Sequence, residues 1–590
     1  MEEPARLLQG FEEALRHRGP DFQGSVQAGD GCVGLTAARL AILDLSPCGR
    51  QPMRSADGRH VIVFNGEIYN FQELRDELSA AGVRFQSYGD TEVVLELYRR
   101  EGAQCVRRLR GMFAFAIWSE EERTCFLARD PLGIKPLYYH YRPENGLLLF
   151  ASEIRTLLSA GLVAKEINPR ALRGYFQSGS VPEPDTLIEG VHCLEAGSWM
   201  RWERGRIERQ TFWQLGFGTA GDPAAFPPSA DAVAETRAAL LDSVAKHFVS
   251  DVPVGLFLSG GIDSTAVLAL AKVNGQDDLR TFSVGFDDHD FDESAVARRS
   301  AEHFGARHEI LRLDAVDGRG LFDQFMRSLD QPSVDGFNTF TVSRFAHEAG
   351  LKVVLSGLGG DELFGGYPSF AQVPRLLRGS RRLGWLGPLR CVGGRWLARA
   401  APKPTWRRLG DFLSQPTDLL HAYRTYRGIF TTLEANALTA AATNDSPMPD
   451  SAASRPEADI YPTPADAISA LEITGYMRNQ LLRDSDVMSM ANSLELRVPF
   501  VDRALFERVT RIPAGRRLRT GKRLLVEAVP EIPAWVTQAP KRGFRFPFEQ
   551  WLTDDWMPSG ALLARSGVRV RSWYQRWAVF VFEDWWRRIT

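Results

Sequence analysis

The sequence predicts two structural parts, an α+β part with stacked sheets followed by an α/β part with a doubly wound parallel sheet. Short β-branched runs and turn signals before residue 215 indicate the first part. Apolar strands that alternate with helical segments after residue 231 indicate the second. Residues 216–231, GFGTAGDPAAFPPSAD, are rich in Gly, Ala and Pro and lack periodicity, as linkers do. We therefore expect domains at 1–215 and 232–590, joined by this linker.

In the first part, the clearest strand signal is the β-branched run VIVFNGEIYN (61–70). Asn-Gly is a strong turn signal, so the strand is expected to break at Asn65-Gly66. Residues 111–119 and 125–130 are expected to be the two arms of a further hairpin. Residues 71–82 and 91–102 have apolar residues at helical spacing and end on glycine, so they are expected to be helices.

In the second part, VPVGLFLS (252–259) is nearly unbroken in its apolar character, as a strand with both faces buried requires. The remainder from about residue 370 is expected to be mostly helical. The other expected elements are helices at 231–248 and 264–273 and strands at 280–286 and 351–357.

Composition excludes several classes of protein. The 590 residues are 44% apolar and 24% charged, as in a globular chain of two to four domains at about 150 residues each. The net charge of −2 argues against nucleic acid as a partner. The sequence lacks a run of 18 uncharged apolar residues and an apolar leader, so we expect no membrane partner. The six cysteines form no C-x-x-C pair, which indicates reduced thiols in a cytoplasmic protein.

The sharpest chemical signal is SGGIDST (259–265), which follows a predicted buried strand and opens a helix. Free N–H groups and the helix dipole bind anions in this geometry, and Gly260 and Gly261 let the backbone approach a phosphate closely. Asp263 suits an anion site only with a cation, which indicates Mg²⁺ between this carboxylate and phosphate oxygens. The spacing is not that of a Walker A loop. The alternative is an ordinary glycine turn. Hydroxyl donors come from Ser259, Ser264 and Thr265.

A second glycine-rich segment, SGLGGDELFGGY (356–367), also follows a predicted buried strand. Parallel strands end at one edge of a sheet, and open α/β sheets bind ligands at that edge. Asp361 is therefore a candidate second Mg²⁺ ligand that faces Asp263 across the crevice. Alone, this segment fits equally well a helix N-terminus with an acidic first turn.

Ten strings in this sequence carry a resemblance to glutamine-dependent asparagine synthetases, and they follow the order of that family. The resemblance implies an N-terminal-nucleophile sandwich that hydrolyses glutamine, and an ATP-pyrophosphatase domain. There ATP adenylates a carboxylate, aspartate by default, and ammonia arriving through a tunnel gives an amide, AMP and pyrophosphate. It also allows a homodimer. The strings are HRGPD (17–21), RLAILD (39–44), FNGEIYN (64–70), GDTEV (89–93), GMFAFAIW (111–118), ARDPLGIKPLYY (128–139), FASEI (150–154), LFLSGGIDST (256–265), GGDELFGGY (359–367) and SMANSLELRVPFVD (489–502).

The resemblance also implies roles in the second part. Asp263 and Asp361 would hold Mg²⁺, which with cationic side chains stabilises charge on the leaving pyrophosphate. Lys522, in TGKRLLVEA, matches the family's lysine near the reacting carboxylate and is expected to be catalytic. Without the resemblance, Lys522 is interpreted as a solvated helix cation. The residues expected to bind ATP are Leu258, Ser259, Gly260, Gly261, Asp263, Ser264, Thr265, Val284, Ser356 and Gly357.

In the first part, the resemblance implies a glutamine site. Arg39 would pair through its planar fork with the α-carboxylate of glutamine. Asp90 and Glu67 would hold the α-ammonium side. Asn65 and the N–H of Gly66 would form a catalytic oxyanion hole, although the pair could be only a turn.

The nucleophile of the family is not found in this sequence. The family begins Met-Cys-Gly, and the exposed cysteine uses its own α-amine as the base. Here Glu2 is second, and neither Cys32 nor Cys48 can carry a free α-amine. We expect that the first strand is missing and that the 590-residue chain does not hydrolyse glutamine. A start placed too late explains this better than an abandoned glutaminase, because the glutamine-site residues are intact.

Two further departures concern the carboxylate acceptor. Leu358 stands where the family has a Glu associated with acyl-adenylate formation, and Asp486-Val487-Met488 stands where it often has D-R-M. The loss of an acid and a cation near the acceptor site weakens the case for aspartate. The main alternative is the same chemistry on another carboxylate in a biosynthetic pathway. A non-catalytic regulator or scaffold is a third hypothesis, against which the intact motif residues argue.

One surface segment stands out by charge. Residues 375–408 hold ten Lys or Arg and no acid, with Trp385, Trp396 and Trp406 among them. A nucleic-acid or anionic-membrane patch is one interpretation. A helical surface insertion is the favoured one. The aromatic tail 573–588 is expected to pack as a terminal helix on the second domain.

Overall fold

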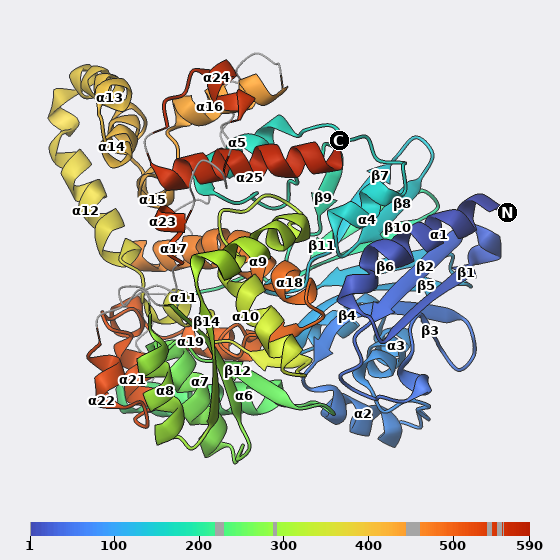
Figure 1. Ribbon diagram of the computed structural model, residues 1–590. Helices are drawn as coiled ribbons and strands as arrows, with labels where there is room; N and C mark the ends of the chain where they lie inside the picture. The colour runs from blue at the N-terminus through green and yellow to red at the C-terminus, as the bar shows by residue number, and fades with distance from the viewer. Residues whose placement is uncertain are drawn as a thin grey trace.

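The structure is a computed structural model in two parts, coloured blue to teal and green to red in Figure 1. Most of the predicted linker, residues 219–228, lies outside the described residues, and helix α6 (Ser229–His247) begins inside the predicted linker. The structure describes residues 2–218, 229–286, 292–443, 461–539, 546–551, 557, 560–570 and 572–590.

The first part is a sandwich of sheets between helices. A six-stranded sheet has the order β11-β10-β6-β5-β4-β3, and it faces a two-stranded sheet, β1-β2, and a three-stranded sheet, β8-β7-β9. Buried side chains such as Leu35, Trp118 and Tyr139 form the core between these layers. The strands are β1 (Phe22–Ala28), β2 (Val33–Arg39), β3 (Met53–Arg54), β4 (His60–Ile68), β5 (Gly111–Ser119), β6 (Thr124–Arg129), β7 (Tyr138–Arg142), β8 (Leu147–Ala151), β9 (Val191–Cys193), β10 (Ser198–Glu203) and β11 (Arg206–Thr211).

Helices cover both outer faces of this sandwich. Leu74, Val93 and Leu97 pack on the free face of the six-stranded sheet, while α1 lies along β2 and α4 on the opposite side. The predicted hairpin and both predicted helices are confirmed, and the layers match the sandwich that the resemblance implies. The helices are α1 (Glu2–Leu15), α2 (Phe71–Ala80), α3 (Asp90–Glu101), α4 (Ile154–Ser159) and α5 (Pro169–Ser178).

The predicted break at Asn65-Gly66 is wrong, because β4 runs straight through both residues and pairs with β5 along its whole length. Gly66 has a φ of +143°, and a Cβ at this position would lie 2.0 Å from the carbonyl oxygen of Met112 on β5. Glycine is therefore required by the close approach of two strands and not by a turn.

The second part is built on a five-stranded parallel sheet with the order β14-β13-β12-β15-β16. Its helices include the predicted α7, which follows β12, and α10, which precedes β15. The predicted doubly wound α/β architecture is confirmed. The elements up to α11 are β12 (Val254–Phe257), α7 (Ile262–Val273), β13 (Arg280–Phe286), α8 (Ser294–His303), β14 (Arg307–Leu313), α9 (Ala315–Ser328), α10 (Phe337–Glu348), β15 (Val353–Leu355) and α11 (Gly360–Phe364).

The rest of the chain is mostly helical, as predicted, and α12, α13 and α14 form an arm that Figure 1 shows in yellow at the upper left. The elements are α12 (Ser369–Arg382), α13 (Pro388–Ala400), α14 (Pro404–Ser414), α15 (Leu419–Arg427), α16 (Thr432–Thr443), α17 (Pro464–Leu471), a π-helical segment (Glu472–Leu482), α18 (Arg483–Met490), β16 (Glu495–Arg497), α19 (Arg503–Val509), α20 (Ala514–Arg517), α21 (Arg523–Ala528), α22 (Ala534–Thr537), α23 (Phe548–Trp551), α24 (Ala561–Ser566) and α25 (Trp573–Ile589).

The aromatic tail forms α25, which packs against both parts. Trp577 and Trp585 are buried, and the Trp577 Nε1–H donates to the Val334 carbonyl at 3.0 Å. The Tyr175 hydroxyl of α5 donates to the Ala578 carbonyl at 2.8 Å. The tail is therefore a packed terminal helix, as predicted, and it also contacts the first part.

Candidate functional site

The two glycine-rich loops meet at the carboxyl edge of the parallel sheet. The first leaves β12 and places Asp263 in the first turn of α7, and the second leaves β15 and places Asp361 in the first turn of α11. A Cβ on Gly360 would lie 2.3 Å from Asp263 Oδ1. A Cβ on Gly357 would lie 2.8 Å from the Asp263 backbone. Both contacts require glycine, so these two glycines allow the loops to touch.

Lys522 joins the two aspartates. Its Nζ forms ion pairs with Asp263 Oδ2 and Asp361 Oδ1, and its side chain is almost entirely buried. Burial lowers the pKa of a lysine, but the two carboxylates outweigh it and hold the pKa of Lys522 above its usual value. Lys522 has a φ of +53° where it caps α21, a strained backbone that is typical of functional positions. The solvated-cation interpretation is therefore wrong.

These residues fit a bound Mg²⁺. Two carboxylates that converge on one cation offer the hard oxygen donors that Mg²⁺ prefers. Within the described ranges no three His, Cys, Asp or Glu residues cluster as a metal site. Mg²⁺ would therefore need phosphate oxygens as further ligands, which is its usual arrangement in nucleotide sites.

The 259–265 loop joins β12 to the start of α7, and its binding of phosphate stays a prediction. Ser259 N–H donates to Ser264 Oγ at 3.2 Å, and Gly261 N–H donates to Ser259 Oγ at 3.4 Å. Gly260 has a φ of +75°, which the loop needs to turn into α7. Ser259 and Gly261 reach solvent, whereas Thr265 is fully buried in α7. A phosphate contact by the Thr265 hydroxyl therefore stays a prediction.

The other residues predicted to bind ATP lie on the adjoining strand ends. Leu258 directly follows β12, and Val284 lies within β13. Both side chains are buried, so a nucleotide would contact the backbone of these residues. Ser356 follows β15, and its Oγ accepts the Leu358 N–H at 3.3 Å. These positions surround the carboxyl ends of three neighbouring strands, where α/β sheets bind ligands.

A cavity of about 190 Å³ opens beside the two aspartates. Leu358 lines it, whereas Val487 does not, so the departure at Val487 lies outside this cavity. Burial raises the pKa of Glu362 to about 8, although the Tyr367 hydroxyl donates to it at 2.7 Å. Burial also raises the pKa of Asp335 and of Asp484. The polar lining is Asp263, Asp335, Asn338, Thr339, Asp361, Glu362, Tyr367, Asp484 and Ser485.

Sequence reasoning missed three of these acids. Glu362 stood in a quoted string without a role, and Asp335 and Asp484 lie in segments with no recognisable motif. Only the fold brings the loop before α10 and the first turn of α18 to the same cavity. The one available signal was that Asp484 lies shortly before the family-like string SMANSLELRVPFVD (489–502).

The predicted glutamine-site residues lie around a second cavity, of about 200 Å³, in the first part. The Arg39 guanidinium donates to the carbonyls of Leu43 (2.9 Å) and Asp44 (2.5 Å), which fix its orientation. The five residues that the structure brings together there are Arg39, Asn65, Gly66, Glu67 and Asp90.

The two acids predicted to bind glutamine, Asp90 and Glu67, line this cavity and have different partners. Asp90 accepts the Ile68 N–H at 2.8 Å, and burial raises its pKa to about 7. Glu67 lies 3.1 Å from Arg497 Nη2 of β16, and burial raises its pKa well above the usual range. Glu67 therefore also ties the first part to the parallel sheet, a contact that sequence reasoning missed.

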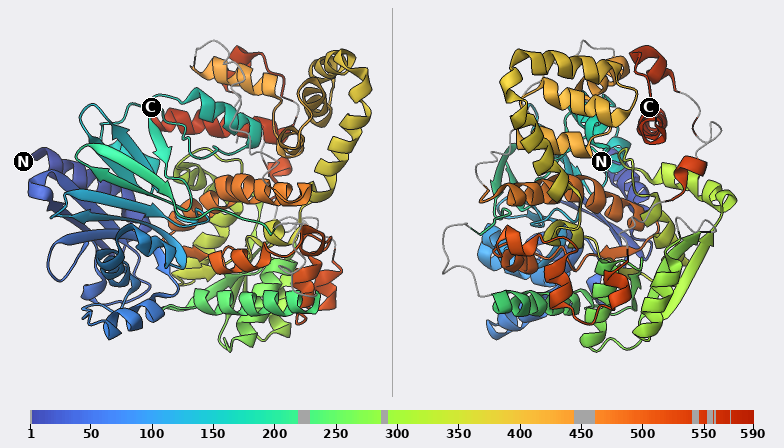
Figure 2. Two further views of the ribbon diagram at one scale, coloured as in Figure 1. Left: turned by 180° about the vertical axis from the view of Figure 1, so that it is seen from behind. Right: turned by 90° about the vertical axis from the view of Figure 1, so that its left-hand side faces the viewer.

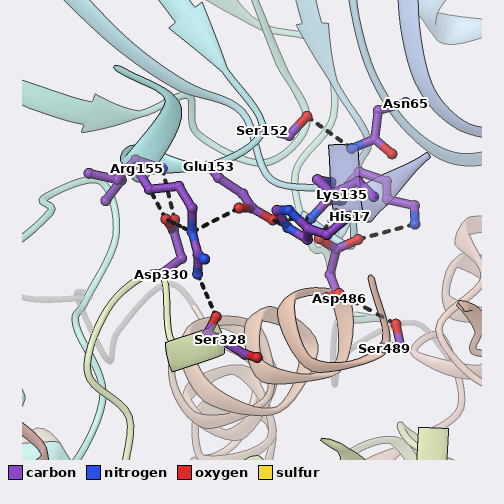
Figure 3. Close-up of polar contacts among 12 residues, drawn as sticks. His17, Asn65, Lys135, Ser152, Glu153, Arg155, Ser328, Asp330, Asp486 and Ser489 are labelled. Atoms are coloured by element: carbon purple, nitrogen blue, oxygen red, sulfur yellow. Dashed lines mark hydrogen bonds and ion pairs between the residues drawn. The ribbon is translucent and has the colours of Figure 1, made fainter. Parts of the chain in front are cut away.

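Asn65 reaches from β4 to the segment after β8, where its Nδ2–H donates to Ser152 Oγ at 3.2 Å (Figure 3). In the part of the chain that the structure describes, no cysteine lines this cavity. Cys32 and Cys48 are exposed elsewhere on the surface. The described residues thus form this cavity without a cysteine thiol.

A buried network of charges crosses the interface between the parts (Figure 3). Arg18 donates to Glu153 at 3.0 Å and to Asp486 at 2.8 Å. Lys135 donates to the other Asp486 oxygen at 3.1 Å. Arg155 links the network to Asp330 of the second part. Arg18 and Lys135 stand in the quoted strings HRGPD and ARDPLGIKPLYY, but their pairing with Asp486 could not be predicted from sequence.

Removing the central carboxylate of this network is expected to destabilise the protein. Asp486→Ala would leave Arg18 and Lys135 buried without their shared partner, which costs about 3–5 kcal/mol for such pairs. Thermal denaturation should show an earlier first transition. Glu121→Ala, which breaks an exposed pair with Arg59, is the matched control and should change stability by less than about 1 kcal/mol. Equal shifts in both variants would contradict a buried, tightly paired Asp486.

Comparisons with known proteins agree with this geometry. A family model described as a glutamine amidotransferase domain matches residues 1–213, and one described as asparagine synthase matches residues 235–572.

Named relatives match most of the chain. A protein of Mycobacterium tuberculosis (strain H37Rv), provisionally named a glutamine-hydrolysing asparagine synthetase, is 38% identical over 91% of this chain and 83% of its own. Glutamine-hydrolysing asparagine synthetase 1 of Bacillus subtilis is 35% identical over 93% of this chain and 85% of its own. Amidase chyE of Penicillium rubens is 29% identical over 91% of this chain and 84% of its own. With a family model on each part and this identity along most of its length, the chain belongs to the glutamine-hydrolysing asparagine synthetase family.

Proposed function

We propose that this protein forms an amide by activating a carboxylate with ATP. A carboxylate oxygen attacks the α-phosphorus of ATP and pyrophosphate leaves. Ammonia then attacks the acyl carbon, AMP leaves, and one proton goes to solvent. The observation that carries the proposal is the meeting of Asp263, Lys522 and Asp361 where the two glycine-rich loops touch. This arrangement supports the proposal, because one cation and two carboxylates lie together beside the loop that is expected to bind phosphate.

The residues of the chain would divide the work as follows. The 259–265 loop binds the phosphates through its backbone N–H groups. Lys522, held charged by its two partners, contacts phosphate oxygens and the reacting carboxylate. Asp263 and Asp361 would hold Mg²⁺, which neutralises charge on the leaving pyrophosphate when bound. In the first part, Arg39, Glu67 and Asp90 would bind glutamine, and Asn65 with Gly66 would form the oxyanion hole.

The cavity beside Asp361 supports an acceptor that carries a cationic group. Glu362, Asp335 and Asp484 are buried acids whose ionisation is favoured when a cation enters. The α-ammonium group of aspartate, the acceptor that the resemblance implies by default, is such a cation. A different carboxylate is the second candidate, because the apolar Leu358 lines the same cavity. A homodimer stays a prediction from the resemblance, and a cytoplasmic location stays a prediction from the cysteine pattern. No described helix is long and apolar enough to cross a membrane.

The test is a panel of carboxylates assayed for AMP with ammonium as the nitrogen source. At least one carboxylate with an amino group should give AMP and pyrophosphate in equal amounts with the amide. ADP and orthophosphate as products would contradict adenylation. A chain with no ATP turnover on any carboxylate, but intact nucleotide binding, would favour a regulator.

Leu358 makes a specific prediction about aspartate. Leucine can neither accept a proton nor bind a cation, so aspartate should be a weak acceptor for this chain. Leu358→Glu is expected to raise aspartate-dependent pyrophosphate release by about tenfold or more, because it adds a carboxylate that can accept a proton or bind a cation at the reacting group. Leu358→Gln, which has a similar size but no charge, is the matched control. Efficient asparagine formation by the unaltered chain would contradict the prediction.

A further inference from the structure

The arm formed by α12, α13 and α14 exposes large apolar side chains on one face. Leu389, Val392 and Trp396 follow one another at spacings of three and four, so they share one face of α13. Trp385 lies in the short helical turn Gly384–Leu386, which precedes α13 across Gly387. We call these four residues the apolar face; their exposed fractions are 82% for Trp385, 70% for Leu389, 63% for Val392 and 70% for Trp396.

The apolar face is held outward by the packing of the arm. On the opposite side of α13, a Cβ on Gly394 would lie 2.7 Å from the Gly410 carbonyl oxygen of α14. A Cβ on Gly410 would lie 2.4 Å from the Ala398 N atom. The two helices therefore touch through glycines, and α13 cannot turn its apolar face inward without losing this contact.

Positive charge borders the apolar face. Arg395 follows Val392 by three positions and Arg399 follows Trp396 by three, so both guanidinium groups lie next to the face. Within the described residues none of the arm's exposed cations forms an ion pair. These cations are Arg375, Arg378, Arg381, Arg382, Arg395, Arg399 and Lys403.

The place of the arm leaves this surface accessible. Figure 1 and the left view of Figure 2 show it at the end of the molecule opposite the N-terminus. An exposed cluster of apolar side chains on a monomer usually marks an interaction site. The segment is helical, as the favoured interpretation expected, but a helical insertion alone does not explain two tryptophans that are more than two-thirds exposed.

We propose that the apolar face docks on an anionic lipid bilayer, with the tryptophans in the headgroup region and the arginines on lipid phosphates. Trp with Leu and Val beside Arg is the composition of helices that lie in a membrane interface. Nucleic-acid bases stack on aromatic side chains, so a nucleic-acid site would have no use for the exposed aliphatic Leu389 and Val392. A second copy of the arm is disfavoured because two cationic surfaces repel each other. Surface docking needs no membrane-spanning helix.

The experiment is flotation of the full chain with vesicles of phosphatidylcholine containing about 30% phosphatidylglycerol, compared with pure phosphatidylcholine. Binding is expected only with the anionic vesicles at about 50 mM NaCl and should fall several-fold at about 500 mM. A mixed-sequence RNA oligonucleotide is tested in parallel. Tighter binding to RNA than to the anionic vesicles would overturn the proposal in favour of nucleic acid.

Two variants separate the apolar and the charged contributions. W385A/W396A and R395E/R399E should each lower the vesicle-bound fraction about tenfold. Tyr88→Ala removes an aromatic side chain that is 77% exposed on the first part and should leave binding unchanged. Thermal midpoints check folding, and if the Trp variant is unstable, the Arg variant decides. The proposal is overturned if the unaltered chain does not bind anionic vesicles at low salt, or if it binds and both stable variants retain that binding.

Discussion

Replacing Asp263 by Asn is expected to lower Mg²⁺-dependent pyrophosphate release about 1000-fold, which corresponds to about 4 kcal/mol of barrier. The amide keeps the size of the side chain but removes the negative charge that would bind the metal. Lys522 keeps Asp361 as its ion-pair partner, so the fold should persist. The measurement is pyrophosphate release at saturating ATP and acceptor, with Mg²⁺ varied.

The control for this variant is Asp323→Asn. Asp323 is exposed on α9 and belongs to neither glycine-rich loop. It should keep the unaltered rate and the unaltered Mg²⁺ dependence. Wild-type turnover by Asp263→Asn would show that the metal assignment is wrong. A rate that recovers fully at high Mg²⁺ would mean that Asp263 affects only metal affinity and not the barrier.

Parts of the fold that depend on local pattern could be predicted from the sequence. Buried parallel strands have a continuous apolar run, and VPVGLFLS (252–259) indeed contains a central strand, β12. Gly260 and Gly261 were expected to let the backbone approach a phosphate closely. In the structure Gly357 and Gly360 also bring the two loops against each other.

The same local reasoning failed where a residue is required by a contact with a distant part of the chain. Asn65-Gly66 has the sequence of a turn, but Gly66 is needed because β5 passes 2.0 Å from where its Cβ would be. Lys522 looks like a solvated cation, but it is buried between two aspartates about 160 and 260 positions away in the chain. Such contacts leave no periodic signal, because a long-range pair depends on topology and not on spacing.

The candidate sites show the same limit. Motifs located part of the lining of the cavity beside Asp361, at Leu358 and Asp361, but not the part formed by Asp335 and Asp484. The pairing of Glu67 with Arg497 was likewise invisible, although both residues stand in quoted strings. A buried charge must have a partner, but the sequence does not identify that partner. Only the fold shows which residue it is.

The second large effect concerns the source of nitrogen. The glutamine cavity holds Arg39 and Asp90 in place, but no cysteine lines it within the described residues. The 590-residue chain is therefore expected to make its amide from ammonium and to release little or no glutamate from glutamine. The measurement is glutamate release with ATP and acceptor present. A normal rate would mean that another nucleophile acts, such as a hydroxyl group that lines the cavity.

An engineered N-terminal extension can add a cysteine thiol to this cavity. In the described structure β2 pairs only with β1, and β8 is the outer strand of its sheet, yet residues of both strands line the cavity. A strand inserted there would find unpaired backbone groups on both sides. Adding an N-terminal strand that begins Met-Cys-Gly should therefore confer glutamate release, because removal of Met exposes a thiol with its own α-amine. The matched extension Met-Ser-Gly should fold alike and release far less. If both extended forms stay silent while ammonium is still used, the glutamine site is unable to act, and abandonment of the glutaminase explains this chain better.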